Sequence, residues 1–213
     1  SDVCSSDLVA DNGYIYLIDT NMIVQFTGAR TKISDLFNSI IDGEHILHNK
    51  NKEFINLYAA FDIYYINKED IRSKAFIGDD KDLNNYRLSL LNKFINDLKA
   101  VGIQPNTTTP IRIQMKTFVE TSETQTIFQA CNYISKEMVG YEYETDGLIF
   151  TPMNTGVGSD KVGETTSPKK ITWDLSFKWK PPEFNTIDFM ISIVKDANGK
   201  EVIKNIFESG TDL

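Results

Sequence analysis

One short segment late in the sequence carries the residues best suited to binding phosphate. Residues 170–182 read KITWDLSFKWKPP, with apolar and polar side chains in strict alternation from 171 to 179. Such alternation is typical of a β-strand, so Lys178 and Lys180 should project from the same face, about 6.6 Å apart along the strand. Two ammonium groups at that spacing suit a phosphate chain. The alternative is a solvated edge strand, where lysines discourage pairing with another strand.

Two acidic turns form a second candidate site. Residues 42–44 (DGE) and 145–147 (TDG) each place a carboxylate beside a glycine, which lets a ligand or metal approach closely. Each also adjoins an apolar stretch, and a carboxylate at the end of a buried strand needs a cation such as Mg²⁺ or a lysine. The alternative is that Asp-Gly serves only to form turns.

The chain is acidic overall, but its charge is unevenly distributed. It has 213 residues with 22 Lys and Arg against 30 Asp and Glu, which gives a formal net charge of −8. This balance argues against a surface that coats nucleic acid in general. Between residues 159 and 180, by contrast, five lysines occur with three acidic residues. An anionic ligand should be sought there first.

The composition excludes several classes of protein. With 41% hydrophobic and 24% charged residues, the chain is typical of a soluble globular protein. It lacks the run of about 18 apolar residues needed to cross a membrane, and residues 1–12 have no features of a secretory signal. Cys4 and Cys131 are too few for a disulfide framework or a cysteine-based zinc site. We expect a protein of a reducing compartment, neither secreted nor associated with a membrane.

Two hairpins should supply the framework that positions the candidate residues. The β-rich runs 14–18 and 22–26 predict the first hairpin, and a longer one is predicted from 36–47 to 54–66. The last of these runs is too continuously apolar to have one face in water. It should be a central strand that is buried on both sides.

Helices and further strands are predicted after the second hairpin. Apolar residues at helical spacing indicate helices over 88–98 and 127–138, the second capped by Thr121 or Ser122. Strands are predicted at 111–119, 148–150 and 171–179. Antiparallel sheets with inserted helices make this an α+β domain.

Two later segments differ from this pattern. The stretch 151–168 is rich in Gly, Ser, Thr and Pro and predicts a mobile surface loop. Residues 187–194 and 202–207 are strand-like runs around a turn at 198–199, after which the sequence stops. They predict the opening hairpin of a second β domain.

Four short segments, in their order along the chain, resemble a known series of motifs. They are 42–44 (DGE), 57–67 (LYAAFDIYYIN), 145–150 (TDGLIF) and 178–181 (KWKP). The series looks like motifs III, IIIa, IV and V of the covalent nucleotidyltransferases. That superfamily contains the mRNA capping guanylyltransferases and the polynucleotide ligases.

Within the superfamily, the chain resembles the capping enzymes most closely. The resemblance is strongest at 146–152 (DGLIFTP) and 177–183 (FKWKPPE). The continuation at 184–189 (FNTIDF) looks like the large, multidomain capping enzymes of nucleocytoplasmic large DNA viruses. In all, the resemblance covers the chain from about Gly13 onward.

The resemblance implies a two-step transfer of GMP. In the family, an enzyme lysine attacks the α-phosphate of GTP, releases pyrophosphate and forms a lysyl-GMP intermediate; GMP then passes to the 5′-diphosphate end of RNA and the lysine is freed. Lys178 and Lys180 would hold the α-phosphate and neutralise the charge that builds on it. Asp146 would bind the divalent metal, Mg²⁺ or Mn²⁺.

The same resemblance assigns three residues to the nucleoside. Glu44 would accept hydrogen bonds from the ribose, and Phe61 would stack on the base. Lys116, on the predicted strand 111–119, is a further candidate for reading the guanine carbonyl.

The resemblance also implies a domain organisation. Residues 9–183 would form part of a nucleotidyltransferase domain, and 184–213 the truncated start of an OB-fold barrel. Residues 1–8 (SDVCSSDL) resemble translated sequencing-adapter read-through at the ends of metagenomic reading frames, and are expected to be a non-native leader. The parent is expected to carry RNA triphosphatase and methyltransferase domains and to act in the host cytoplasm, a viral factory or the virion.

One departure from the family pattern affects activity. The nucleophile should lie in a Lys-x-Asp-Gly motif before the first hairpin, yet no lysine precedes Lys32. The chain is therefore expected to be a fragment that forms no covalent adduct by itself. Two other interpretations stay open, an ATP-dependent polynucleotide ligase and a catalytically inactive nucleotide-binding or interaction module.

Overall fold

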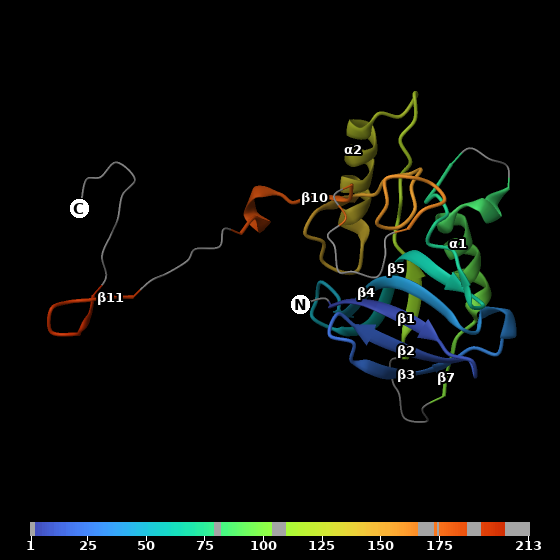
Figure 1. The fold of residues 1–213 in the computed structure, drawn as a ribbon, viewed down its shortest axis with the longest axis horizontal. Helices are drawn as coiled ribbons and strands as arrows, with labels where there is room; N and C mark the ends of the chain where they lie inside the picture. The colour runs from blue at the N-terminus through green and yellow to red at the C-terminus, as the bar shows by residue number, and fades with distance from the viewer. Residues whose placement is uncertain are drawn as a thin grey trace. The chain divides into compact units, whose positions relative to one another are not determined.

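The computed structural model describes residues 3–78, 82–103, 110–165, 173, 175–186 and 193–202. The chain divides into two compact units, Ser1–Trp179 and Lys180–Leu213. The first unit contains a large twisted β-sheet and both α-helices (Figure 1).

In the described part of the first unit, eight strands belong to one sheet. Its order is β6-β5-β4-β1-β2-β3-β7, and β8 also pairs with β5. The strands are β1 (Val3–Val9), β2 (Tyr14–Asp19), β3 (Val24–Arg30), β4 (Ser39–His48), β5 (Phe54–Ile66), β6 (Glu69–Asp70), β7 (Val101–Gly102) and β8 (Arg112–Met115). The β5–β8 pair is parallel, whereas the sequence predicts antiparallel sheets. A helix lies between these two strands in the chain, and such a crossover allows the parallel direction.

Both predicted hairpins are confirmed. β2 pairs with β3 and β4 pairs with β5, each in the antiparallel direction. β5 has β4 on one side and β6 and β8 on the other, and its residues 57–60 are all buried. Consecutive buried residues in a strand require cover on both faces, as the apolar run predicts.

β1 lies in the interior of the sheet, between β2 and β4. It includes most of the eight residues that resemble adapter read-through. Its Asp7 lies opposite Leu17 on one side and Ile41 on the other. Asp7 is 1% exposed, and neither of its carboxylate oxygens has a hydrogen-bond partner among the residues that the structure describes.

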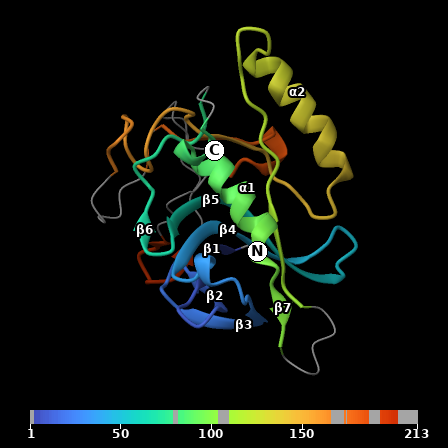
Figure 2. The ribbon, with the colours of Figure 1, turned by 90° about the vertical axis from the view of Figure 1, so that its right-hand side faces the viewer.

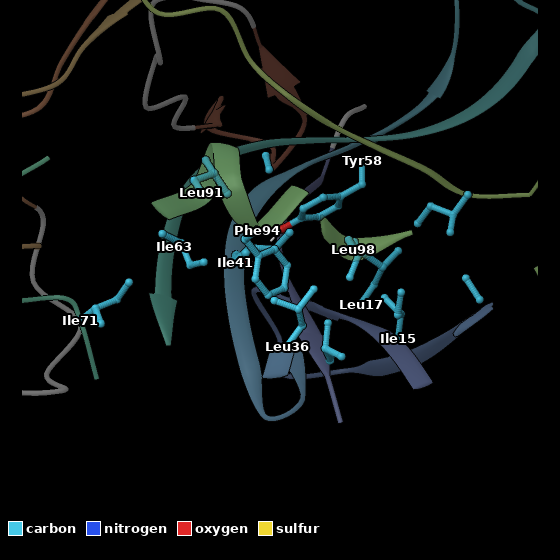
Figure 3. Packing of buried hydrophobic residues seen from close by; sticks show 14 residues of the cluster. Ile15, Leu17, Leu36, Ile41, Tyr58, Ile63, Ile71, Leu91, Phe94 and Leu98 are labelled. Atoms are coloured by element: carbon cyan, nitrogen blue, oxygen red, sulfur yellow. Dashed lines mark hydrogen bonds between the residues drawn. The ribbon is translucent and has the colours of Figure 1, made fainter. Parts of the chain in front are cut away.

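Helix α1 (Arg87–Leu98) packs across one face of the sheet (Figure 2). Its buried residues Leu91, Phe94 and Leu98 recur at helical spacing and face the strands. Figure 3 shows them among apolar side chains of the sheet, which include Ile15, Leu17, Ile41, Tyr58 and Ile63. The helix is followed by Lys99 in the left-handed region, with φ of 41°, earlier than the predicted end at Gly102.

Helix α2 (Ile127–Glu137) begins too far along the chain for the predicted residues, Thr121 or Ser122, to cap it. Thr126 caps it, since the Gln129 amide donates to the Thr126 hydroxyl at 3.4 Å. The Gln129 side chain accepts from the Thr126 amide at 2.8 Å and completes a capping box. The predicted caps, Thr121 and Ser122, are therefore wrong, because a cap must immediately precede the first helical residue.

The predicted strand 171–179 is shorter than its alternation suggests. β9 (Leu148–Phe150) and β10 (Phe177–Trp179) form a separate two-stranded antiparallel sheet. The Ser176 amide donates to the Trp173 carbonyl at 3.2 Å, so the chain turns immediately before β10. Residues 171, 172 and 174 lie outside the described residues.

The segment after β9 is irregular, as its composition predicts, but backbone hydrogen bonds anchor it to another part of the chain. Residues 166–168 of the predicted loop lie outside the described residues. The Ile77 amide donates to the Met153 carbonyl, and the Val157 amide to the Arg72 carbonyl, both at 2.8 Å. Thr155 between them is 6% exposed. Residues 151–165 are irregular, but backbone hydrogen bonds hold them against the segment 71–77.

The second unit contains a hairpin of β11 (Val194–Lys195) and β12 (Glu201–Val202) around Asn198 and Gly199. This agrees with the turn predicted at 198–199. Residues 187–192 and 203–207 of the predicted strand runs lie outside the described residues, and the OB fold stays a prediction. Short 3₁₀ helices occur in both units at Ser34–Leu36, Leu83–Asn85, Met138–Gly140 and Pro182–Phe184. Among the described residues, no helix has the length and apolar character needed to span a membrane.

Candidate functional site

Three neighbouring strands bring Glu44, Phe61 and Lys116 together. Glu44 on β4 lies opposite Ala59 of β5, two residues before Phe61. Lys116 directly follows β8, and its amide donates to the Ala60 carbonyl at 2.8 Å. Because β8 runs parallel to β5 in this register, Lys116 lies beside Glu44, although the two residues are 72 positions apart in the sequence.

The three side chains form one contact group, which we call the base cluster. The Lys116 ammonium makes an ion pair with the Glu44 carboxylate. The same nitrogen lies 5.9 Å from the centre of the Phe61 ring. The Lys116 and Glu44 side chains are 25% and 29% exposed, so the group is open to solvent on one side. The sequence-predicted residues for the nucleoside thus share one place in the fold.

The base cluster combines three kinds of interaction that a planar heterocycle can use. An aromatic ring supplies a stacking surface, an ammonium donates hydrogen bonds, and a carboxylate accepts them. A partly exposed ion pair of this kind adds little to folding stability, typically below about 1 kcal/mol. A ligand can therefore compete for Lys116 and Glu44 at low cost.

Tyr143 lies next to the base cluster. It packs against the buried group formed by Ile46, Ile55, Leu57 and Ala59. Burial is the largest cause that raises the pKa of Tyr143 to about 12, and the negative charge of Glu44 adds to it. The segment that leads into Asp146 therefore passes close to Glu44. Nothing in the sequence pattern singles out this tyrosine.

Asp42, two residues before Glu44, has a different environment. Tyr64 donates its hydroxyl hydrogen to the Asp42 carboxylate at 2.5 Å. Burial raises the pKa of Asp42 to about 6, although this hydrogen bond opposes the shift, and Asp62 across the strand pair raises it further. Residues 42–44 lie inside strand β4 and do not form the predicted turn. Of their two carboxylates, only Glu44 has a lysine partner among the described residues.

Arg87 and Asp62 form a buried ion pair behind the base cluster. The Nε and Nη2 atoms of Arg87 donate to the two oxygens of Asp62 at 2.8 Å and 3.1 Å. The Arg87 side chain is fully buried, and its guanidinium lies 5.4 Å from the ring centre of Phe76. The sequence contained one signal for this pair, an aspartate inside an apolar strand, because a buried charge is rare unless paired.

Asp146 and Lys178 are associated with the two-stranded sheet. Trp179 pairs with Leu148 and Lys178 with Ile149, so β10 runs beside the strand that Asp146 precedes by two residues. Lys178 is exposed. Lys180 is the first residue of the second unit.

The surroundings of Asp146 show what kind of divalent metal site the chain could form. In the ranges that the structure describes, no three His, Cys, Asp or Glu side chains gather to form a metal site. Asp146 would therefore supply one carboxylate rather than a complete cage. That donor set fits Mg²⁺, which proteins often bind through one or two carboxylates together with substrate phosphates.

Comparison with known proteins connects these features. The family model described as "mRNA capping enzyme, catalytic domain" matches residues 8–182. The chain belongs to this family. The match includes the base cluster, the two-stranded sheet and the buried pair.

Curated members of the capping-enzyme family show the same relationship. The chain is 27% identical to the mouse mRNA-capping enzyme over 164 residues, which cover 75% of this chain and 23% of the mouse protein. It is 26% identical over 233 residues to a probable mRNA-capping enzyme of Acanthamoeba polyphaga mimivirus, covering 90% of this chain and 19% of that protein. The chain thus spans about a fifth to a quarter of the length of these relatives.

Proposed function

We propose that the chain is part of an mRNA guanylyltransferase, which transfers GMP from GTP to the 5′-diphosphate end of RNA through a lysyl-GMP intermediate. The observation that carries this proposal is the base cluster of Glu44, Phe61 and Lys116. It lies in a chain that belongs to the capping-enzyme family, and its three groups match the needs of a guanine nucleoside.

The base cluster would bind guanosine by exchanging its internal ion pair for contacts with the ligand. Phe61 would stack on the purine, and the Lys116 ammonium would donate to the guanine carbonyl oxygen. Glu44 would accept hydrogen bonds from the ribose hydroxyls. Adenine has an amino group where guanine has this carbonyl, so the ammonium would favour GTP over ATP.

Lys178, Lys180 and Asp146 would act on the triphosphate. The two ammonium groups would hold the α-phosphate and compensate the negative charge that grows during transfer. Asp146 would hold Mg²⁺ or Mn²⁺, which supplies charge neutralisation at the phosphate oxygens when bound. The chain has no Lys-x-Asp-Gly sequence, so we expect it to bind the nucleotide without forming the covalent intermediate.

We further propose the setting in which the parent protein works. A large viral capping enzyme would carry RNA triphosphatase and methyltransferase domains on the same chain, in the host cytoplasm, a viral factory or the virion. The probable mRNA-capping enzyme of mimivirus, of which the matched region covers 19%, supports the viral and multidomain character of the parent but not the identity of its other domains. An OB-fold domain from residue 184 onward is part of the same proposal.

Equilibrium binding of fluorescent GTP and ATP analogues to this chain in Mn²⁺ tests the base preference. GTP should bind at least about tenfold more tightly, because a buried or partly buried hydrogen-bonding group discriminates strongly between donors and acceptors. Equal or tighter binding of ATP would favour the polynucleotide ligase instead. Absence of binding to either nucleotide would favour the inactive interaction module.

Labelling of the parent protein with α-³²P-GTP tests the transfer. A form extended at its N-terminus by a segment that contains a Lys-x-Asp-Gly motif should be labelled by GTP and poorly by ATP. Lys178→Ala and Lys180→Ala should each abolish labelling, as each removes roughly 2–4 kcal/mol of transition-state stabilisation. Lys161→Ala is a matched control from the same lysine-rich segment, and its label should match that of the unmodified protein. Normal labelling of both test variants would show that the phosphate assignment is wrong.

A further inference from the structure

The two-stranded sheet of β9 and β10 has no strand pairing with the eight-stranded sheet in the described residues. The base cluster, by contrast, is fixed by the registers of β4, β5 and β8. The position of Asp146 and Lys178 relative to the base cluster therefore depends on contacts that flank β9.

One set of contacts precedes β9. The Arg112 guanidinium makes an ion pair with Glu142 at 2.8 Å, and the Lys50 amide donates to the Glu142 carbonyl at 2.8 Å. Both side chains of the Arg112–Glu142 pair are about 40% exposed. An ion pair with that exposure constrains its segment weakly. The main anchor before β9 is therefore Tyr143, which packs against the buried group of Ile46, Ile55, Leu57 and Ala59.

The second set follows β9, and Arg87 lies at its centre. The Nη1 atom of Arg87 donates to the Thr155 carbonyl at 3.1 Å and also to the Lys74 carbonyl. Backbone hydrogen bonds from Ile77 to Met153 and from Val157 to Arg72 surround this contact. Arg87 is the side chain that joins the segment 151–157 to both α1 and the segment 71–77.

The other end of the Arg87 guanidinium reaches the base cluster through β5. Asp62, which accepts both of its remaining hydrogen bonds, directly follows Phe61. A single planar group thus connects the strand that carries the stacking ring with the segment that leaves β9. Guanidinium is suited to this because its donors have a fixed fork geometry that lysine lacks.

We propose that Arg87 is a positioning residue, which holds the Asp146–Lys178 sheet at the correct place relative to the base cluster by bridging Asp62 and the Thr155 carbonyl. This inference rests on the proposed function for its consequence, the joint binding of base and metal-bound phosphates. The bridge from Asp62 through Arg87 to the Thr155 carbonyl is formed within this chain and does not depend on the proposed function. Weakening it should displace the phosphate-binding residues and leave the base cluster intact.

Hydrogen exchange on the 213-residue chain separates positioning from general stability. In Arg87→Lys, the amides of Ile77, Val157 and Gly163 should exchange faster, together with those of β9 and β10. Amides of β4 and β5 should keep their protection. Arg72→Lys is the matched control, since the Arg72 side chain pairs with Asp70 at the surface, and it should change nothing. A uniform increase across β4 and β5 would overturn the proposal.

Ligand binding supplies a second readout with a different outcome for each hypothesis. Arg87→Lys should bind guanosine as tightly as the unmodified chain, but bind GTP with Mn²⁺ about 10- to 100-fold more weakly, as expected when the support of a metal ligand is removed. An equal loss for both ligands would overturn the positioning role. If the unmodified chain binds neither ligand, the proposed function fails while the hydrogen-exchange result still decides the role of Arg87.

A second variant covers the case in which Arg87→Lys does not fold. Asp62→Asn keeps the shape of the side chain and its oxygen acceptor but removes the charge that aligns Arg87. It should produce the same local exchange pattern and the same selective loss of binding to GTP with Mn²⁺. Unchanged exchange at Val157 and unchanged binding in a folded Asp62→Asn protein would count against the bridge.

Discussion

Two ion pairs that lie on or beside strand β5 differ in almost every property except their chemistry. Arg87–Asp62 is sealed from water, and the guanidinium also donates to two backbone carbonyls. Glu44–Lys116 is partly exposed and lies beside one aromatic ring. A buried pair with many partners is costly to separate, so it can set geometry. A half-open pair is easily separated, which leaves its groups available to a ligand.

Asp7 extends the comparison to a buried carboxylate that has no hydrogen-bond partner in the described part of the chain. It lies in the interior of the same sheet, and burial raises its pKa well above the usual value. The sheet thus holds carboxylates in three states. Asp62 is buried and paired, Glu44 is partly exposed and paired, and Asp7 is buried without a hydrogen-bond partner among the described residues.

Predictions for Arg87, Asp7 and Lys116 test whether these states have different energies. Asp42, whose carboxylate accepts a hydrogen bond from the Tyr64 hydroxyl, adds a fourth case.

The largest effect is expected from removing one member of the sealed pair. Arg87→Ala should lower the free energy of unfolding by about 3–5 kcal/mol, because it leaves the Asp62 carboxylate buried without its counter-charge. Urea unfolding followed by circular dichroism measures this. Arg72→Ala removes a surface arginine of the same strand-to-helix segment and should cost less than about 1 kcal/mol. Equal losses of unfolding free energy in Arg87→Ala and Arg72→Ala would show that burial does not change the contribution of an ion pair.

The next effect is the pH dependence that arises from Asp42. Its pKa is about 6 in the folded protein, above the unfolded value of 3.8, so the folded state holds a proton that the unfolded state has lost. Stability should therefore fall as pH rises from about 4 through 6, by on the order of 2–3 kcal/mol. Asp42→Asn, which keeps an acceptor for Tyr64, should reduce this slope in urea unfolding. Burial also raises the pKa of Asp7 and of Asp62, so these two carboxylates account for the slope that is left.

Asp70 provides the control of opposite sign for Asp42. The Arg72 guanidinium lowers the pKa of Asp70 to about 2, so its contribution is present above pH 3.8 and is lost as pH falls through 2. Asp70→Asn should leave the slope between pH 4 and 7 unchanged. An unchanged slope in Asp42→Asn would contradict the assignment of that slope to Asp42.

Replacing the unpaired carboxylate should stabilise the fold. Asp7→Val removes a buried group that has no hydrogen-bond partner and introduces a strand-forming residue of similar size, so we expect a gain of about 1–3 kcal/mol at neutral pH. The rise in the midpoint of thermal unfolding measures it. Asp11→Val, at an exposed position nearby, should give no gain. A loss of stability in Asp7→Val would show that the carboxylate has a favourable role in β1.

The smallest effect on stability is expected at the half-open pair. Lys116→Met keeps the length of the side chain and should change the free energy of unfolding by less than about 1 kcal/mol. Its effect on binding should be larger, with GTP affinity lowered about 10- to 100-fold and the preference over ATP lost. Calorimetric titration and urea unfolding of the same sample compare the two. Retained preference for GTP would exclude Lys116 as the residue that reads the base.

Much of the fold follows from local sequence patterns. The apolar run in β5 predicts its central position, and the spacing of Leu91, Phe94 and Leu98 predicts the buried face of α1. The predictions from sequence were wrong or incomplete where the structure depends on a contact that leaves no periodic pattern in the sequence. The cap of α2 depends on the Thr126–Gln129 pair, and the segment around Thr155 has loop composition but is held by hydrogen bonds to residues distant in sequence.

The sequence by itself determined the family, the order of its motifs and the identity of Glu44, Phe61 and Lys116 as candidates. Only the tertiary structure decided that Lys116 pairs with Glu44, 72 residues away, and that Arg87 bridges Asp62 and Thr155, which are 25 and 68 residues from it. Side-chain periodicity reports contacts within a few residues along one element. Long-range pairs depend on strand register and on how helices cross the sheet, and these are set by the packing of the whole core.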